Sequence, residues 1–234
     1  MLFRSQASAA ITISPSPSPS PSYSYSYSYS YSCMLKFVPQ AELASEQAYE
    51  AFIFANKRIP TRDNSHDFFN GLCWLRFPRT KSRLNYLQAK EITEQGIGTT
   101  RGSLRDALTL FDENVLLLQS SDGVWQALQQ RDWKKLFGEL RHEWQSAHMV
   151  LFGHALLEKL VAPYKSITAH VYRIASDVDA KDDQALDDWL ATNLESTYLA
   201  TKPFLPLPVL GIPGWWSANE DSSFYADTQV FRVA

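Results

Sequence analysis

Histidines, carboxylates and amides gather in three short stretches of this chain, and these residue types perform acid–base or metal-assisted chemistry. The first stretch, RDNSHDFFNGLCWLRFPRTKSRLN, runs from Arg62 to Asn85 and places His66 beside Asp67, with Asn70 one helical turn later. Imidazoles and carboxylates transfer protons near neutral pH or ligate metal ions. The stretch therefore predicts a candidate site, although it carries no cofactor fingerprint, complete metal-ligand spacing or nucleophile signature that would name the reaction.

The same stretch has the pattern of an amphipathic helix. Asn64 is a suitable N-cap, and Phe68, Leu72 and Leu75 recur at the three- and four-residue spacing of one buried stripe. Pro78 ends the predicted helix, because proline is disfavoured in a helix interior. We expect the apolar stripe to face the core and the polar residues to lie beside it.

A purely structural interpretation of the first stretch stays open at this point. Asp67 is an acid in the first turn, where it complements the positive end of the helix dipole. His66 is then a partly buried, hydrogen-bonded residue with no task in catalysis. Cys73, on the same helix, is expected to be a small core residue.

The second stretch, FGHALLEKL, places His154 and Glu158 four residues apart, on one face of a predicted helix. Such a pair either binds a metal ion, holds an imidazole in one tautomer, or is an ordinary surface pair. As the catalytic hypothesis, His154 is a general base oriented by Glu158, while His66 or Asp67 binds metal or donates a proton. This hypothesis predicts that both histidines lie in one cleft, within about 10 Å of each other.

The third stretch contains the acids Asp106, Asp112 and Glu113. The apolar runs ALTLF and LLLQS flank Asp112, Glu113 and Asn114, which predicts a β-hairpin with an acidic turn. Adjacent strand residues point to opposite faces, so one two-carboxylate site is disfavoured. The three acids are kept as candidate ligand-binding residues, against the alternative that Asp112 and Asn114 only make turn hydrogen bonds.

A basic run follows the first predicted helix and consists of Arg76, Arg79, Lys81 and Arg83. It either clamps a small anion or forms a solvated connection between helices. As the binding hypothesis, the helix N-terminus at Asn64–Asp67 faces Arg76 or Arg79 across a cleft. Arg79 and Asn70 are therefore candidate ligand-binding residues.

The elements that position these groups predict an α+β fold, as a single mainly helical domain with a short β-hairpin and few strands. The helix over 182–194 is expected to turn Leu186, Leu190 and Leu194 inward. The Pro- and Gly-rich segment 203–231 is expected to cross the domain as an irregular strap that buries at least one tryptophan. The remaining expected elements are helices over 82–95 and within 124–144, and strands over 149–152 and 167–174.

Composition excludes several classes of protein. The chain has 234 residues with 22 basic and 25 acidic side chains, a net charge of −3. That balance gives no general attraction to nucleic acid or to an anionic membrane. No stretch is long and apolar enough to predict a membrane span. Two cysteines form no disulfide framework, which favours a reducing, cytoplasmic location. Composition identifies neither a cofactor nor a partner, and both stay unknown from the sequence.

Residues 1–33 form a separate low-complexity leader. Pro-Ser repeats cover 15–22 and Tyr-Ser repeats cover 23–32, with no aliphatic residue in either. We expect this leader to be disordered and the globular domain to span 34–234. Because Met34 follows the repeats directly, we hypothesise that translation starts there.

Four motifs in order, NSHDFFNGLCWLRFPRTKSRLN, RDALTLFDEN, FGHALLEKL and PLPVLGIPGWWSANEDSSFY, resemble the bacterial family known as domain of unknown function 3025. The resemblance covers Phe37 to Arg232. It implies no activity, since the family has no established biochemical function. Its motif residues map onto the polar groups already identified, namely His66, Asp67, Asn70, Asp106, Asp112, Glu113, His154 and Glu158.

Three classes of function remain open from the sequence. The first is a hydrolase-like enzyme with an acid–base or metal-assisted site. The second is a module that binds a small anionic ligand, and the third is a structural or interaction protein with an apolar patch around Trp215 and Trp216. The pair His66-Asp67 also occurs in HD-type phosphohydrolases, but no histidine precedes it here and strands interrupt the helices.

Overall fold

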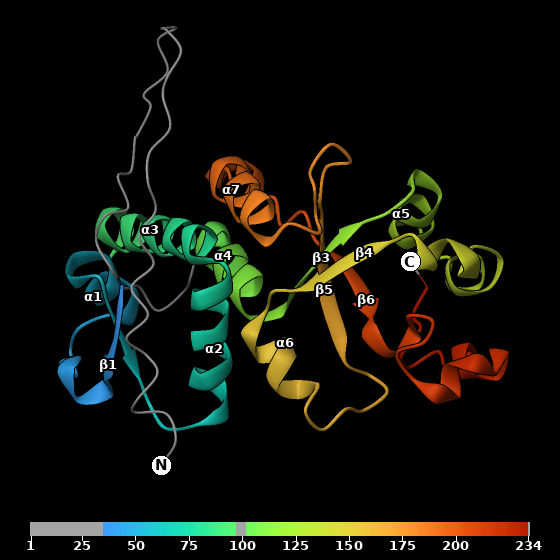
Figure 1. Cartoon of the computed structure of the whole chain (residues 1–234), viewed down its shortest axis with the longest axis horizontal. Coiled ribbons are helices and arrows are strands. Elements are labelled where there is room, and N and C mark those ends of the chain that lie inside the picture. The colour runs from blue at the N-terminus through green and yellow to red at the C-terminus, as the bar shows by residue number, and fades with distance from the viewer. Residues whose placement is uncertain (1–34, 97–101, 234) are drawn as a thin grey trace, which may run out of the picture. The chain divides into compact units, whose positions relative to one another are not determined.

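The structure is a computed structural model that describes residues 35–96 and 102–233. The expected leader over 1–33 and the expected start at Met34 lie outside the described residues. The chain divides into two compact units between Arg62 and Asp63. Helices and short strands occur in both units, so the α+β class is confirmed (Figure 1).

The first unit is a small parallel strand pair with one helix. Strand β1 (Lys36–Pro39) pairs with β2 (Arg58–Thr61), and η1 (Gln40–Glu42) and α1 (Tyr49–Asn56) connect them. The left-handed backbone of Lys57, with φ of 55°, ends α1 and starts the return strand.

The second unit carries the candidate site. Its helices and strands, in chain order, are α2 (Ser65–Arg76), α3 (Pro78–Gln95), α4 (Ser103–Asn114), β3 (Val115–Gln119), α5 (Asp122–Gln129), β4 (His148–Leu151), α6 (His154–Lys159), β5 (Thr168–Arg173), α7 (Asp183–Asn193), α8 (Ser196–Leu199) and β6 (Leu205–Pro208). Short helical turns are η2 (Lys135–Glu139), η3 (Arg141–Gln145), η4 (Val209–Gly211), η5 (Ser217–Glu220) and η6 (Ser222–Ala226). None of the described helices is both long and apolar enough to cross a bilayer.

The four-stranded sheet of the second unit has the order β4-β3-β5-β6. Strands β3 and β5 are parallel neighbours, with Leu117 opposite Tyr172, and the two outer pairs are antiparallel. Residues 115–118 are four consecutive apolar residues without solvent exposure. A continuous apolar run is typical of a strand covered on both faces, and β3 is such a strand.

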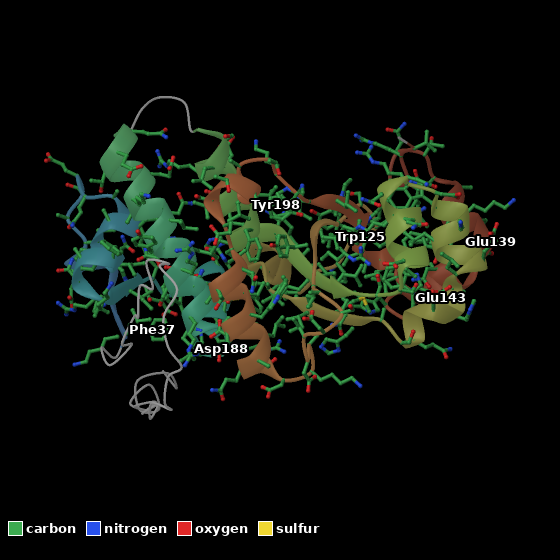
Figure 2. The ribbon with its side chains drawn as sticks, turned by 90° about the horizontal axis from the view of Figure 1, so that it is seen from above. Phe37, Trp125, Glu139, Glu143, Asp188 and Tyr198 are labelled. Carbon is green, nitrogen blue, oxygen red and sulfur yellow. The ribbon has the colours of Figure 1, made fainter. Side chains whose placement is uncertain are left out.

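Helices cover the two faces of this sheet from opposite sides. Helix α7 packs Leu186, Leu190 and Leu194 with α4 on one face, as the sequence predicted for α7. Helix α5 and the turn η2 pack on the other face. Trp125 of α5 and Tyr198 of α8 are labelled in Figure 2.

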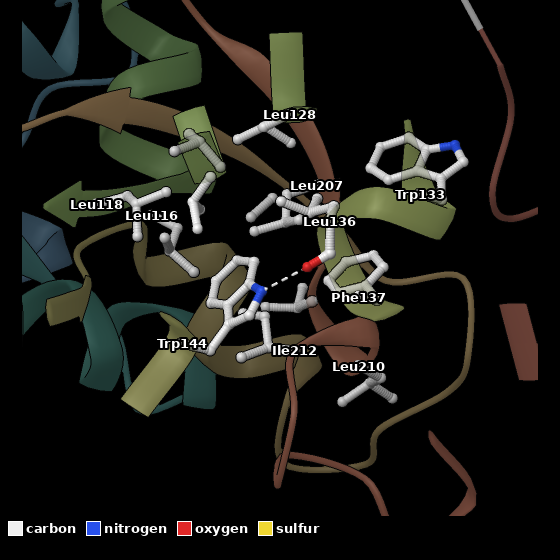
Figure 3. Packing of buried hydrophobic residues seen from close by; sticks show 14 of the residues in the cluster. Leu116, Leu118, Leu128, Trp133, Leu136, Phe137, Trp144, Leu207, Leu210 and Ile212 are labelled. Atoms are coloured by element: carbon white, nitrogen blue, oxygen red, sulfur yellow. Dashed lines mark hydrogen bonds between the residues drawn. The ribbon is translucent and has the colours of Figure 1, made fainter. Parts of the chain in front are cut away.

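The core on the α5 face is rich in aromatic residues (Figure 3). Phe137 stacks against Trp133 and Trp144, with ring centroids 6.0 Å and 5.8 Å apart. The buried indole N–H of Trp144 donates to the carbonyl oxygen of Leu136 at 2.9 Å, so burial leaves no unpaired donor there.

The predicted hairpin around Asp112 is wrong. The run ALTLFDEN forms the end of α4, because Ala107, Leu108 and Phe111 share one buried helical face. Short apolar runs fit a helix as well as a strand, and here the three- and four-residue spacing decides. Asp112 therefore lies at the C-terminal end of a helix, and β3 pairs with β4 and β5 instead.

The predicted buried stripe of α2 is also wrong. Asn64 caps the helix as expected, accepting from the Asp67 N–H at 2.8 Å. Phe68, Leu72 and Leu75, however, are 39%, 43% and 57% exposed. The polar face is buried instead, where Asn70 accepts from Lys81 of α3 and the Cys73 thiol donates to the carbonyl oxygen of Phe152. The buried residues of α2 are Asp67, Asn70, Cys73 and Trp74.

The C-terminal segment is more regular than predicted. Its first part forms β6, which pairs with β5, and η4 then carries Val209 and Leu210 into the core. Trp215 and Trp216 pack partly buried against the same core, so the expected burial of a tryptophan in this segment is partial.

Candidate functional site

His66 and His154 touch each other, although 88 positions separate them in the chain. The Nε2 atoms of the two rings are 3.0 Å apart, and the rings meet edge to face with centroids 4.5 Å apart. Helices α2 and α6 lie side by side and present these residues from their first turns (Figure 1). The geometric expectation that both histidines lie within 10 Å of each other is met, while their chemical role stays a prediction.

Gly153 allows α6 to begin at this place. A Cβ atom on residue 153 would lie 2.4 Å from the carbonyl oxygen of Glu113, so only glycine fits against the end of α4. His154 follows as the first residue of α6. The close approach therefore brings its ring to the C-terminal end of α4.

The outer nitrogen of His66 is held by Glu158. His66 Nδ1 lies 3.1 Å from Glu158 Oε2, and the Ser65 hydroxyl donates to Glu158 Oε1. These hydrogen bonds, first from Ser65 and then from His66, lower the pKa of Glu158 below its ordinary value. The carboxylate is therefore ionised at neutral pH.

The prediction that Glu158 orients His154 is wrong. His154 turns away from its own helix partner, and its Nδ1 lies 2.8 Å from the Asp112 carbonyl oxygen and 3.5 Å from Asp112 Oδ2. Glu158 instead reaches across to α2. Burial lowers the pKa of His154, Asp112 partly opposes this shift, and Lys81 adds to it. His154 is neutral at pH 7.

Lys81 anchors the inner end of this network. Its side chain is 4% exposed and its Nζ donates to Asp112 Oδ1 and, at 2.8 Å, to Asn70 Oδ1. It also lies over the ring of Trp74, 5.3 Å from the centroid. Burial raises the pKa of Asp112, but the charge and hydrogen bond of Lys81 together with the neighbouring His154 and His66 outweigh burial, and the net pKa of Asp112 is lowered.

The partners fix where the protons lie. The carbonyl of Asp112 only accepts, so His154 Nδ1 carries a proton and, in the neutral ring, Nε2 has a free lone pair. His66 Nε2 must then donate to it. His66 Nδ1 faces the ionised carboxylate of Glu158, so His66 has an acceptor on each side, Glu158 Oε2 and His154 Nε2.

Several predicted site residues lie elsewhere. Asp106 pairs with Lys202 at 3.3 Å on the surface. Arg79 pairs with Asp188, which Figure 2 labels on α7. Glu113 is partly buried and contributes its backbone carbonyl to the contact with Gly153.

The predicted anion clamp is not formed by Arg76. Its guanidinium pairs with Asp183 of α7 at 2.7 Å, where both side chains are half exposed. Asp67 is buried in the first turn of α2, with its backbone N–H on Asn64. The arginines therefore fasten α2 and α3 to α7, and the helix N-terminus is closed by its own cap.

The ring nitrogens of the two histidines are occupied by other partners. The Glu158 carboxylate and the Asp112 backbone carbonyl hold the Nδ1 atoms, whereas the Nε2 atoms face each other. In the part of the chain that the structure describes, no three His, Cys, Asp or Glu side chains are placed to hold one ion. Cys73 offers no nucleophile, because burial raises its thiol pKa to about 11.

Fold and site together define an α+β protein with a partly buried chain of polar groups that joins four helices. The chain belongs to the family described as "Protein of unknown function (DUF3025)", which matches residues 35–234. The match confirms the family resemblance and covers most of the chain. Comparison with curated proteins and with solved structures gave no match.

Proposed function

We propose that the chain is a hydrolase-like enzyme whose histidine pair, His66 and His154, performs general acid–base catalysis. One observation carries the proposal, the direct 3.0 Å contact between two Nε2 atoms whose rings are both held from behind by oxygen acceptors. Two imidazoles in direct contact share one proton. For the shared proton to reach a substrate atom, the His66 ring turns its Nε2 away from His154, because its Nδ1 is held by Glu158.

The two histidines have different parts in this proposal. The His66 side chain is 39% exposed and the His154 side chain 6%, so His66 is the one that a substrate reaches. His66 donates or accepts the proton at the reacting atom, and Glu158 orients it. His154 holds the second position for the proton, and Asp112 fixes its tautomer.

A structural network is the second candidate. Each of the polar side chains Lys81, Asp112, His154, His66 and Glu158 has a described partner, and together they join α2, α3, α4 and α6. A network with complete pairing holds helices together without any reaction. The two candidates differ in whether proton transfer by His66 is needed for function.

The test compares His66→Gln with His142→Gln. Glutamine keeps a hydrogen-bonding side chain but does not titrate, and His142 is an exposed histidine far along the chain. Purified wild-type and variant proteins are assayed on chromogenic carboxylic esters and phosphate mono- and diesters across pH 5 to 9. We expect hydrolysis by wild type and His142→Gln and a loss on the order of 10²- to 10⁴-fold in His66→Gln.

Absence of hydrolysis by the wild type on all three ester classes contradicts the hydrolase proposal. Equal rates in wild type and His66→Gln contradict the role of the histidine pair and favour the structural network. Thermal unfolding of both variants separates loss of chemistry from loss of fold.

A further inference from the structure

A second location, at the carboxyl end of β3, has the topology of a ligand site. Strands β3 and β5 are parallel neighbours, and the connections that follow them turn to opposite faces of the sheet. After β3 the chain enters α5 on one face of the sheet, and after β5 it leads to α7 on the other. Where neighbouring parallel strands diverge in this way, a crevice opens outside their carboxyl ends, and open α/β sheets bind ligands there.

A cavity occupies this position. Its volume is about 680 Å³, and it is lined by the residues that directly follow the two strands, 120–122 and 173–177. Tyr172, Trp189 and Tyr198 supply aromatic walls. The volume suits a ligand of small-molecule size, since such sites range from roughly 300 to 1,000 Å³.

Tyr172 provides an independent observation that indicates a ligand. The residue is 5% exposed, and in the described chain its hydroxyl makes no hydrogen bond. That hydroxyl is also not sealed from solvent, because the fully buried polar atoms without a partner in the described residues are Arg105 Nε and His170 Nδ1. Tyr172 is thus a nearly buried lining residue whose hydroxyl reaches solvent and has no protein partner in the described residues.

The charges of the lining select against an anion. The guanidinium of Arg173 pairs with Asp122, and Asp177 adds a second, exposed carboxylate. One guanidinium against two carboxylates leaves a net negative charge at the crevice. Aromatic walls stack flat rings, and carboxylates accept hydrogen bonds from ligand hydroxyl groups.

We propose that this crevice binds a small neutral ligand that combines a flat ring with hydroxyl groups, of the nucleoside class. Tyr172 hydrogen-bonds the ligand, Trp189 or Tyr198 stacks on its ring, and Asp122 or Asp177 accepts from its hydroxyl groups. The proposal is independent of the histidine pair, because His154 contacts Asp112 before β3 begins while the crevice starts after β3 ends.

The test measures binding to the full chain by tryptophan fluorescence and by NMR chemical shifts. The probes are adenosine, guanosine, cytidine and uridine, their 5′-monophosphates, and the sugars ribose and glucose. We expect at least one nucleoside to bind and its monophosphate to bind more weakly. A sugar that binds as well as every nucleoside, a monophosphate that binds more tightly, or a panel without binding overturns the proposal.

Tyr172→Phe tests the contact directly, because it removes only the hydroxyl. It is expected to weaken nucleoside binding about 2- to 10-fold and to leave the melting temperature unchanged. Tyr164→Phe, an exposed tyrosine outside the lining, is the matched control and is expected to change neither. Unchanged binding in Tyr172→Phe contradicts the proposal.

Asp177→Asn keeps the proposal testable if Tyr172→Phe folds poorly, because Asp177 is exposed and has no described partner. Removing its charge is expected to narrow the difference in affinity between the nucleoside and its monophosphate. An unchanged difference contradicts the assignment of the crevice.

Discussion

Polar side chains near the two ends of β3 differ in whether they have hydrogen-bond partners within the protein. At its amino end, the network formed by Lys81, Asp112, His154, His66 and Glu158 pairs every member with another. At its carboxyl end, a cavity of about 680 Å³ is lined by Tyr172, whose hydroxyl has no partner in the described chain. In the first region the polar side chains satisfy one another, and we call it the closed network. In the second region the Tyr172 hydroxyl lacks a protein partner, and we call it the open crevice.

This difference separates two uses of a polar side chain in a small fold. A buried polar group costs free energy unless it is hydrogen-bonded, so the closed network stabilises the positions of four helices. The open crevice lacks such pairing within the protein, and in our proposal a bound ligand supplies the missing hydrogen-bond partners. Substitutions should therefore change stability at the amino end of β3 and binding at its carboxyl end.

The largest effect is expected from Lys81→Met. This change leaves Asp112 partly buried without its cation, and breaking a buried ion pair costs about 3–5 kcal/mol. Arg76→Met is the matched control, because its pair with Asp183 is half exposed and such pairs contribute about 0–1 kcal/mol. Urea unfolding of both variants measures the difference. Equal losses of unfolding free energy in the two variants would show that the Lys81–Asp112 pair contributes no more to stability than a surface ion pair.

A second test measures whether a thiol reagent reaches Cys73, which lies on the buried face of α2 next to the network. Its Sγ lies 3.0 Å from the carbonyl oxygen of Phe152, and a thiol pKa of about 11 lowers the thiolate fraction about 100-fold at neutral pH. In a Cys33→Ser background, we expect a thiol reagent at pH 8 to label Cys73 only after unfolding. Rapid labelling of the folded chain would show that the packing around the network opens readily.

A third test uses pH. Burial lowers the pKa of His154 in the folded chain below its ordinary value of 6.5, and His170 is shifted in the same direction by burial. The unfolded chain then binds more protons between the two values, so stability rises with pH. The free energy of unfolding is expected to fall as pH drops below about 6.5 and through the folded pKa. His154→Gln should flatten this dependence, and an unchanged slope would place its origin elsewhere.

The smallest effect is expected at the crevice. Asp122→Asn removes the ion pair between Asp122 and Arg173, in which the Asp122 side chain is 81% exposed. Exposed pairs contribute at most about 1 kcal/mol, so the melting temperature should barely change. A loss of stability as large as that of Lys81→Met would remove the contrast between the two ends of β3.

The sequence predicted elements best where the pattern was long or its signals agreed. Helix α7 was predicted with its three inward leucines, and β4 and β5 were predicted close to their observed bounds. The end of α3 at Gln95 was predicted, but the helix begins at Pro78 and not at Ser82. The hairpin failed because ALTLF is too short for its period to separate strand from helix. The buried face of α2 failed because counting apolar residues favoured Phe68, Leu72 and Leu75, whereas tertiary partners bury the polar face.

The site itself was predicted only in part. His66 and His154 were predicted as site residues because each begins a predicted helix beside apolar residues. The structure brings the two side chains into contact. Lys81 was missed, because it was grouped with a solvated basic run. Its position three residues before Leu84 and seven before Gln88 places it on the buried stripe of α3, and that spacing was the available signal. The partners of each imidazole depend on how α4, α2 and α6 pack, which no local pattern contains.

The protonation states of the two imidazoles test the central claim most directly. Nitrogen-15 NMR of ring-labelled histidines at pH 7, with His66→Gln and His154→Gln for assignment, reports which ring nitrogens carry protons. We predict that His154 is neutral with its proton on Nδ1, and that the proton between the two rings is on Nε2 of His66. A His154 ring protonated on Nε2 would contradict the shared proton and the acid–base role built on it.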